Sequence, residues 1–384
     1  MLKEKKTIYE KKFSFEDFYS SMKTSVFSQI NRSIKIIKKE LLNKEKKNIY
    51  FYNILQKVLT DLLKQQKNIK SDLKINRFIA DEIARIDDKN ISRYFFNRYR
   101  YDVFPIENRI DDYPPYVQIE LSSRCNYRCV FCYQPIFSKH KEMMGMMNFD
   151  TYKSIVEQIE GHVEFISLAS RGEPLLCKDI EKILQYNIEK FLCVKLNTNA
   201  YFLREHFIHA ILTGGINTLV FSVDTTDEKE YAQMRINGNL KKVKKNIEMF
   251  YNIKQKYYPD SKIITRISGV KINESQDIKS MISFWKSLVD QIVFVKYMPW
   301  EDVYNSKSNN ITLPCSELWK RIFIWYNGKT NPCESDFLST FSMGNIRNKS
   351  ISKIWKSPKY QKLRNQHLLG NRNLIFPCQN CIFV

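Results

Sequence analysis

The sequence predicts an α/β protein: a parallel sheet with helical crossovers, preceded by a helical domain and followed by a small cysteine-rich domain. Three observations support this fold class. Short apolar runs alternate with helical stretches between residues 116 and 298, the pattern of a parallel sheet with right-handed crossovers. The region before this is rich in lysine and lacks the alternation. The region after it, 305–384, contains four cysteines in two pairs.

Residues 1–111 are expected to form the helical domain. They are nearly free of glycine and proline, and apolar residues recur at helical spacing over 27–37 and 54–62. We expect three or four amphipathic helices that end near Pro105, and no strand. Two adjacent prolines within 111–115 stop any helix and mark the boundary. The domain would serve as a cap or docking surface, and recruitment of a substrate or partner is the alternative.

Residues 112–304 are expected to form the core domain. Strands are predicted over 116–123, 162–170, 193–199, 218–224, 262–271 and 291–298. Helices are predicted near 149–160, 178–189, 203–213, 239–255 and 276–289. In α/β barrels the chemistry gathers at the carboxyl ends of the strands, so polar residues that follow these strands are the first candidates for a site.

Three cysteines follow the first predicted strand at the spacing C-x3-C-x2-C: Cys125, Cys129 and Cys132. Thiolates are the usual ligands of iron–sulfur clusters, and a [4Fe–4S] cluster normally takes four of them. Three can hold three irons and leave the fourth open to a substrate or cofactor, as an open position does in catalytic zinc sites. A structural zinc site is the alternative, with His140 as the nearest histidine.

The region 305–384 has a complete set of four further cysteines: Cys315, Cys333, Cys378 and Cys381. The dipeptide at 327–328 is Asn-Gly between apolar runs, which predicts a hairpin that brings the first two cysteines together. The last two form a tight C-x2-C chelate. Four thiolates suffice for one cluster or for one zinc ion.

The first cysteine motif, with the aromatic Phe131 before its last cysteine, resembles that of the radical S-adenosylmethionine (SAM) superfamily. The resemblance implies a partial (β/α)6 TIM-like barrel in which the open iron of a [4Fe–4S] cluster binds SAM. One electron would cleave SAM to a 5′-deoxyadenosyl radical that abstracts a substrate hydrogen. The second cysteine set resembles the SPASM/twitch domains of this superfamily, with the twitch form closer, and implies an auxiliary [4Fe–4S] cluster.

The strand ends also carry residues that match SAM-binding positions of the superfamily: Phe131, Gly172, Glu173, Asn199, Ser222 and Arg235. The loop Ser-Arg-Gly-Glu-Pro resembles the family's Gly-Gly-Glu loop, with Arg171 in place of one glycine. Arg235 would offer a two-pronged fork to the SAM carboxylate. Turn formation is the alternative for Asn199, because asparagine favours turns.

Asp336, three residues after Cys333, is the candidate catalytic residue. Related enzymes place a carboxylate near the auxiliary cluster, where it can take a proton as the substrate is oxidised. A solvent-exposed aspartate at a hairpin end is the alternative. Glu334, Tyr297 and Glu301 are secondary candidates for polar contacts with the substrate.

Composition bounds the location and partners of the protein. The N-terminus is charged, with no apolar run behind it, and no stretch approaches about 18 apolar residues, so we expect a cytoplasmic protein without a signal peptide or membrane span. Nine cysteines in short spacings then indicate metal ligation rather than disulfides. The net charge of +21 suggests nucleic acid, but a lysine- and asparagine-rich composition explains much of it, and an anionic substrate or solvated surface is favoured.

The predicted function is that of a radical SAM oxidoreductase or epimerase. A four-cysteine cluster has no open position, which favours electron transfer and a net oxidation. The resemblance to single-auxiliary enzymes implies a sugar- or aminocyclitol-like substrate, with a flavodoxin or ferredoxin as reductant. The alternatives are a maturase of ribosomal peptides, an iron–sulfur or zinc protein that binds nucleic acid without catalysis, and a degenerate scaffold that binds a partner.

Overall fold

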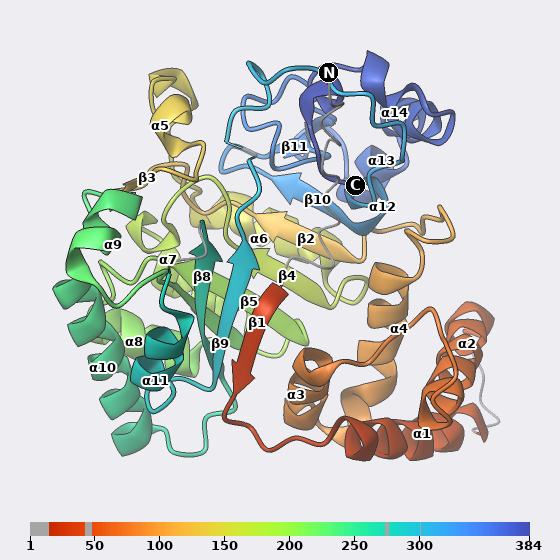
Figure 1. The fold of residues 1–384 in the computed structure, drawn as a ribbon. Coiled ribbons are helices and arrows are strands. Elements are labelled where there is room, and N and C mark those ends of the chain that lie inside the picture. The colour runs from red at the N-terminus through yellow and green to blue at the C-terminus, as the bar shows by residue number, and fades with distance from the viewer. Residues whose placement is uncertain (1–14, 43–47, 273–275, 300) are drawn as a thin grey trace, which may run out of the picture.

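The computed structural model describes residues 15–42, 48–272, 276–299 and 301–384 (Figure 1). Within these residues one sheet of ten strands runs through the molecule in the order β1-β9-β8-β6-β5-β4-β2-β10-β11-β12. The six parallel strands of the barrel are β2 (Tyr116–Ile119), β4 (Phe165–Leu168), β5 (Cys193–Thr198), β6 (Thr218–Ser222), β8 (Ile264–Lys271) and β9 (Gln291–Lys296). The six strands predicted for the core domain are therefore confirmed.

Helices connect these strands and cover the outer face of the sheet (Figure 1). They are α6 (Phe149–Ile159), α7 (Ile180–Tyr186), α8 (Glu205–Thr213), α10 (Leu240–Tyr257) and α11 (Ile278–Trp285). β5 shows why the sheet has two different faces. Val194 and Leu196 are buried in the core shared with these helices, whereas Lys195 and Asn197 alternate with them and face the inside of the barrel.

In the described part of the N-terminal domain there are four α-helices: α1 (Val26–Leu42), α2 (Ile49–Gln66), α3 (Arg77–Arg85) and α4 (Ile91–Asp102). Their apolar faces bury a separate core that includes Ile37, Leu55 and Phe95. The side chains of Asn48 and Asn76 accept hydrogen bonds from the first turns of α2 and α3 and so fix where those helices begin. The prediction of three or four helices is confirmed.

The prediction that this domain contains no strand is wrong. β1 (Phe15–Ser20) pairs antiparallel with β9, and Figure 1 shows the two strands side by side. The ring of Phe18 lies 6.2 Å from that of Phe78 on α3, and Ser20 donates a 2.7 Å hydrogen bond to Asp81. A short segment in a lysine-rich region becomes a strand because the open edge of β9 supplies its hydrogen-bond partners, which helical periodicity cannot reveal.

The C-terminal region extends the same sheet at its other edge. β10 (Arg321–Ile324) pairs parallel with β2, and it forms a hairpin with β11 (Lys329–Asn331), which pairs with β12 (Gly344–Asn345). Gly328 at the turn has φ +82°, a conformation that glycine adopts without strain. The predicted hairpin is confirmed. α12 (Glu317–Lys320), α13 (Ile351–Trp355) and α14 (Pro358–Leu368) complete this region.

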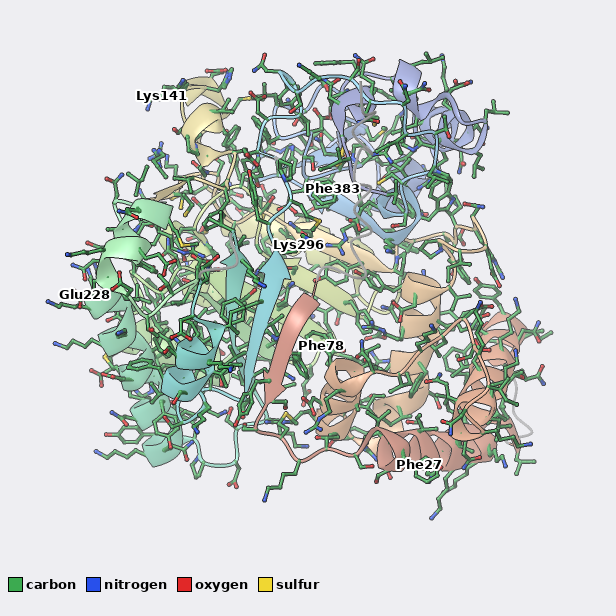
Figure 2. The ribbon with its side chains drawn as sticks, in the orientation of Figure 1. Phe27, Phe78, Lys141, Glu228, Lys296 and Phe383 are labelled. Carbon is green, nitrogen blue, oxygen red and sulfur yellow. The ribbon has the colours of Figure 1, made fainter. Side chains whose placement is uncertain are left out.

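The sheet thus crosses both of the boundaries predicted near residues 111 and 304, and the ends of the chain supply strands to both sides of the barrel. Figure 2 shows Lys296 at the carboxyl end of β9, with Phe383 of the C-terminal segment above it. Among the described residues, no helix is long and apolar enough to cross a membrane.

Candidate functional site

A cavity of about 460 Å³ opens at the carboxyl ends of the barrel strands, where α/β barrels place their chemistry. We call it the barrel cavity. Each barrel strand or the residue that follows it contributes to its wall, through Gln118, Ser167, Lys195, Asn197, Ser222, Ser268 and Val295. All nine residues that the sequence assigned to the first cluster and to SAM line this one cavity: Cys125, Cys129, Cys132, Phe131, Gly172, Glu173, Asn199, Ser222 and Arg235.

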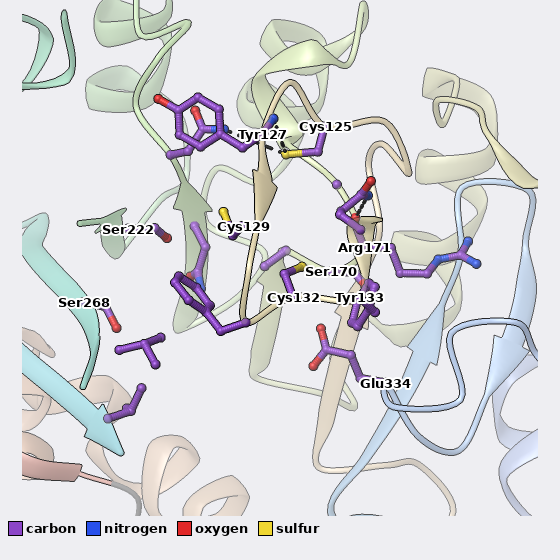
Figure 3. Close-up of a pocket in the computed structure, with 18 of the residues that line it drawn as sticks. Cys125, Tyr127, Cys129, Cys132, Tyr133, Ser170, Arg171, Ser222, Ser268 and Glu334 are labelled. Carbon is purple, nitrogen blue, oxygen red and sulfur yellow. Dashed lines mark hydrogen bonds between the residues drawn. The ribbon is translucent and has the colours of Figure 1, made fainter. Parts of the chain in front are cut away.

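The three thiols face this cavity from the loop that follows β2 (Figure 3). Cys129 lies in β3 (Arg128–Cys129), which pairs with β7 (Arg235–Ile236), so the loop is fixed to the helix that precedes β7. The backbone N–H of Tyr127 donates to the Cys125 sulfur at 3.5 Å. His140, the histidine considered for a zinc site, does not line the cavity and lies 3.5 Å from Glu142.

Burial raises the pKa of all three thiols, that of Cys125 to about 12. The free thiols therefore keep their protons at neutral pH, and a metal that binds here must displace them. Within the described ranges, no three His, Cys, Asp or Glu side chains come close enough together to hold a single metal ion. The three sulfurs instead line the cavity wall as separate groups.

Gly172 lets its loop pack directly on the cysteine loop. A Cβ at this position would lie 2.4 Å from the carbonyl oxygens of both Ser122 and Arg124, closer than any side chain can approach. The backbone N–H of Glu173 donates to the Arg124 carbonyl at 2.8 Å. Only glycine allows this contact, so Gly172 lets the loop after β4 pack directly against the loop that carries Cys125.

The carboxylate of Glu173 is buried and held by three donors. It accepts hydrogen bonds from the Thr198 hydroxyl at 2.7 Å, the Asn199 N–H at 2.8 Å and the Leu175 N–H at 3.1 Å. Burial raises its pKa to about 7, even though these hydrogen bonds act in the opposite direction. Asn199 in turn donates to Asn126 at 2.9 Å, and its amide lies 4.0 Å from the Cys125 sulfur.

Arg235 lies beside the thiols, but two N–H groups of its guanidinium already donate to another side chain. Its Nε and Nη2 donate to the two oxygens of Asp224, at 2.5 Å and 3.0 Å. The remaining Nη1 lies 3.7 Å from the Cys129 sulfur, and the guanidinium lies over the Phe131 ring. The fork therefore faces Asp224 and not the open cavity. Asp224 pairs with Arg235 and accepts the Val270 N–H, while Asp227 caps α9 (Glu228–Met234).

Three polar atoms of wall residues have no hydrogen-bond or ion-pair partner among the described residues: the side-chain oxygens of Gln134 and Asn197 and the Ser170 hydroxyl. All three atoms are buried. Unpaired buried polar groups are rare and call for a ligand or water. Together with three thiols and a glycine that admits close approach, they fit a cluster with one open iron and a cofactor bearing amino and hydroxyl groups, such as SAM.

The second cysteine set lines a smaller cavity of its own, the C-terminal cavity. Cys315, Cys333, Cys378 and Cys381 all belong to its wall, so the structure brings together the four cysteines that the sequence grouped. His367 and Arg372 lie in the same wall. The ring Nδ1 of His367 accepts the Cys315 N–H at 3.2 Å, and burial lowers the His367 pKa to about 3. His367 is therefore neutral, with its proton on Nε2.

That Nε2–H, and the Nε–H of Arg372, have no hydrogen-bond partner among the described residues. N–H donors in a wall that also carries four thiols suit the sulfur atoms of an iron–sulfur cluster, because hydrogen bonds to sulfur tune such clusters. The donor set therefore fits the auxiliary cluster expected here.

Asp336 lies in the wall of the C-terminal cavity and not of the barrel cavity. It is buried, so the alternative of a solvent-exposed aspartate is wrong. Its carboxylate accepts hydrogen bonds from the Tyr304 hydroxyl at 2.8 Å, the Thr340 hydroxyl at 2.7 Å and the Phe341 N–H at 2.8 Å. Burial raises its pKa. These contacts hold the loop after β11 in place, and proton transfer by Asp336 stays a prediction.

Of the secondary candidates, Glu334 and Tyr297 line the barrel cavity. Glu334 accepts a 2.9 Å hydrogen bond from Gln118 on β2. Glu301 contacts the Tyr297 hydroxyl and is not part of the wall. Figure 3 shows Glu334 on the opposite side of the thiols from Ser222.

Arg171 departs from the family's Gly-Gly-Glu motif in sequence, and in the structure it connects the barrel with the C-terminal region. Its guanidinium forms two hydrogen bonds with buried Glu120, at 2.5 Å and 2.6 Å, and donates to the Phe337 carbonyl at 2.9 Å. It also lies 4.1 Å from the centre of the Trp325 ring. Figure 3 shows the side chain pointing away from the thiols toward the C-terminal strands. The signal in the sequence was Glu120, a carboxylate within an apolar run.

The polar residues Gln118, Lys195 and Arg321 of the cavity wall were also missed. Lys195 and Asn197 are spaced by two residues in an apolar strand, and this alternation was the available signal for an inward face. Arg321 lies in the C-terminal region, and its approach to β2 depends on the β2–β10 pairing, which the sequence does not reveal.

Two family models match the chain. One, described as the Radical SAM superfamily, matches residues 119–284, and the other, SPASM, described as an iron–sulfur cluster-binding domain, matches residues 315–382. The chain is 26% identical over 211 residues to a GTP 3′,8-cyclase of Clostridium botulinum (strain Okra / Type B1), covering 51% of this chain and 63% of that protein. Against the GTP 3′,8-cyclase of Campylobacter jejuni subsp. doylei it is 25% identical over 186 residues, covering 48% and 56%.

The chain therefore spans about three fifths of the length of these curated relatives. Among solved structures, Streptococcus suis SuiB bound to precursor peptide SuiA superposes with a TM-score of 0.54 at 17% identity, covering 82% of this chain and 80% of that chain. At this identity the likeness concerns the fold alone.

Proposed function

Since the chain belongs to the radical SAM superfamily and carries a SPASM domain, we propose that it cleaves SAM reductively and uses the radical to oxidise a small polar substrate. The cofactors expected from the sequence, [4Fe–4S] clusters and SAM, are those of these two domains. The observation that carries the proposal is the convergence of Cys125, Cys129 and Cys132 with the strand-end residues on one cavity. The remaining wall of that cavity includes polar groups, among them Gln118, Lys195 and Glu334, that would face a substrate.

In this proposal the three thiols hold the first cluster and leave one iron for SAM. When bound, these cofactors supply a radical that removes one hydrogen atom from the substrate. The buried Ser170 hydroxyl and Asn197 oxygen, which lack protein partners among the described residues, hydrogen-bond to polar groups of SAM. Arg235 keeps a positive charge 3.7 Å from the Cys129 sulfur, which favours the thiolate form needed for ligation.

The second cluster is proposed to accept the electron that an oxidised substrate gives up. Its four thiols leave no position open for a substrate, which favours electron transfer over substrate binding. Cys333 lines the C-terminal cavity, and the next residue, Glu334, lines the barrel cavity. One peptide unit therefore separates the walls of the two sites, which supports a short route for the electron.

A small substrate is favoured by the volume of the cavity, and a polar one by the hydrogen-bonding groups in its wall. About 460 Å³ must hold part of SAM as well as the substrate. The outer edge of β9 is already paired with β1, so a peptide cannot add to the barrel there as a strand. Oxidation or epimerisation of a hydroxyl-bearing carbon in a sugar- or aminocyclitol-like compound is therefore the first candidate. Modification of a peptide is the second, because SuiB, which shares the fold, has been solved with its precursor peptide.

The first test is SAM cleavage by protein reconstituted without oxygen. Dithionite replaces the predicted flavodoxin or ferredoxin, and 5′-deoxyadenosine is quantified by chromatography. We expect product from the wild type and none from the Cys125→Ala/Cys129→Ala/Cys132→Ala variant. Metal analysis of the same samples separates iron from zinc. Failure of the iron-loaded wild type to form 5′-deoxyadenosine would falsify the proposal and favour the binding-protein alternatives.

The second test concerns the auxiliary cluster. Cys378→Ala/Cys381→Ala should lower the iron content from about eight to about four atoms per chain, because one [4Fe–4S] cluster is lost. SAM cleavage should persist in this variant, whereas turnover of an oxidisable substrate should stop. Unchanged iron content would show that these two cysteines do not hold a cluster.

A further inference from the structure

We propose that the substrate carries an anionic group, a carboxylate or a phosphate, and that Lys195 in the inner part of the barrel cavity binds it. The inference rests on the proposed function, because it concerns the substrate of the same cavity. It is carried by the position of Lys195 in the wall and by the charges around it.

Lys195 lies on β5, deeper in the barrel than the groups assigned to SAM. It is three residues before Thr198, whose hydroxyl contacts Glu173, and this corresponds to about 10 Å along a strand. Ser167 is its register neighbour on β4, and Gln118 lies opposite the same β4 residue on β2. All three side chains line the cavity. A substrate between Lys195 and the thiols would thus have an ammonium group and neutral hydrogen-bonding groups at its far end.

The arginines and carboxylates of the wall are already matched, and Lys296, its other lysine, is exposed at the carboxyl end of β9. Arg171, Arg235 and Arg321 form ion pairs with Glu120, Asp224 and Glu317, respectively. The carboxylate of Glu173 is held by three donors, and that of Glu334 accepts from Gln118. Lys195 differs from these groups, because its ammonium has no hydrogen-bond or ion-pair partner among the described residues. Because the three arginines already have carboxylate partners, an anion that enters the inner part of the cavity would pair with Lys195.

The surroundings of Lys195 are net positive. Burial is the largest cause of its lowered pKa, which falls to about 8, and the charges of Arg266 and Arg321 act in the same direction. Tyr101 and Glu334 offset this only in part. Lys195 therefore still carries its proton at pH 7, in a site where a positive charge is costly without a counter-ion. A substrate anion would remove that cost, and a low-dielectric cavity strengthens the attraction.

The test is protection of Lys195 from acetylation in the reconstituted enzyme with SAM bound. Acetic anhydride is applied at pH 8 and constant ionic strength, and the label at each lysine is quantified by peptide mass spectrometry. Inorganic phosphate and acetate are the probes, and glycerol is the neutral control. We expect at least one anion to slow labelling of Lys195 about threefold or more, while the exposed Lys349 is unaffected. The more protective anion distinguishes a phosphate from a carboxylate. Equal labelling of Lys195 with and without anions overturns the proposal.

Thermal shifts of variants give an independent readout. The protecting anion should raise the melting temperature of the wild type, of Lys195→Arg and of the surface control Lys349→Met, but not of Lys195→Met, because a ligand stabilises only the fold that binds it. An equal rise in the melting temperature of Lys195→Met overturns the proposal. If Lys195→Met does not fold, the Lys195→Arg variant, which keeps a positive charge, is used to keep the test valid. SAM cleavage by the wild type is measured in the same preparation. Its absence would count against the proposed function, whereas loss of anion protection alone counts only against the role of Lys195.

Discussion

Arg171 joins three parts of the molecule through one guanidinium. It pairs with Glu120 at the end of β2, donates to the Phe337 carbonyl of the C-terminal region, and packs against the rings of Phe137 and Trp325. Both members of the ion pair are almost fully buried. In such a pair the loss of one partner is costly because the other charge is left in the interior without compensation.

Arg171→Met should therefore lower the free energy of unfolding by about 3–5 kcal/mol, and Glu120→Gln should have a similar effect. The double variant should lose much less than the sum of the two, since no unpaired charge remains. Urea unfolding, monitored by circular dichroism, gives the free energy of unfolding of the wild type, the two single variants and the double variant. Arg347→Met, at an exposed position, is the matched control and should change stability by no more than about 0.5 kcal/mol. Additive losses would contradict a direct Arg171–Glu120 interaction.

Glu173 gives the fold a dependence on pH. Its pKa is raised from 4.5 to about 7 by burial, so the folded chain holds this proton more tightly than the unfolded chain does. Its contribution to stability is full below about pH 4.5 and is lost as the pH rises through about 7. In the cofactor-free protein, Glu173→Gln should remove a fall in stability on the order of 3 kcal/mol across this window. Melting temperatures of variant and wild type between pH 4.5 and 7.5 test this. Parallel curves would mean that Glu173 is already ionised in the folded chain.

At the scale of elements, the site depends on two loops that touch through their backbones. Gly172 lies beneath the carbonyls of Ser122 and Arg124, so the loop after β4 and the cysteine loop after β2 are in direct contact. Because both loops leave neighbouring parallel strands, their contact sets how far Glu173 lies from Cys125.

Gly172→Ala should push these loops apart, since its Cβ would lie 2.4 Å from two backbone oxygens. We expect a loss of about 1–3 kcal/mol in stability, as in other overpacked sites, and fewer iron atoms bound per chain. Gly161→Ala is the control. It has open space but φ +78°, and should cost about 1 kcal/mol without changing iron content. Normal iron loading in Gly172→Ala would show that the loops can move apart without harm to the cluster site.

The elements that the sequence predicts well are those with a repeating local pattern. The six barrel strands are rich in apolar residues and alternate with helical stretches, and the hairpin at Gly328 has a turn signature. β1 has neither, because its pairing with β9 comes entirely from tertiary structure.

The same limit holds for side chains. The cysteines are recognisable by spacing alone, whereas the fork of Arg235 was expected to face SAM and instead meets Asp224. Arg235 and Asp224 are eleven residues apart, and their pairing depends on how α9 packs against the end of β6. The sequence does not reveal that packing. Lys195 carried a weak signal in its alternation with Val194 and Leu196.

At the scale of the whole molecule, the sheet does not stop at the barrel. The β2–β10 pairing and the contacts of Arg171 connect the barrel with the cysteine-rich region, and the two cysteine cavities lie on either side of Cys333 and Glu334. Two regions that share one sheet and buried ion pairs should unfold together.

We therefore expect one cooperative unfolding transition. Trp285 lies in α11 of the barrel, whereas Trp319, Trp325 and Trp355 lie in the C-terminal region, and all four are buried. Fluorescence of Trp285→Phe and of Trp319→Phe/Trp325→Phe/Trp355→Phe variants therefore weights different regions. In each variant the urea midpoint from fluorescence should equal that from circular dichroism of the same protein. A chain ending at residue 304 should be less stable or insoluble, because it exposes the β2 edge that β10 covers. Separate midpoints would show that the cysteine-rich region is an independent folding unit.

The pairing of β1 with β9 also bears on how the chain is made. Tyr19 lies opposite Ile292, so the partners are separated by roughly 270 residues. At about 5–20 residues per second, a ribosome needs roughly 14–55 s to synthesise the second strand after the first. Throughout that time the nascent chain has to keep its first strand away from other open edges. β1 can pair with β9 only after β9 has been synthesised. The first strand of the sheet to be made is therefore among the last to form its hydrogen bonds.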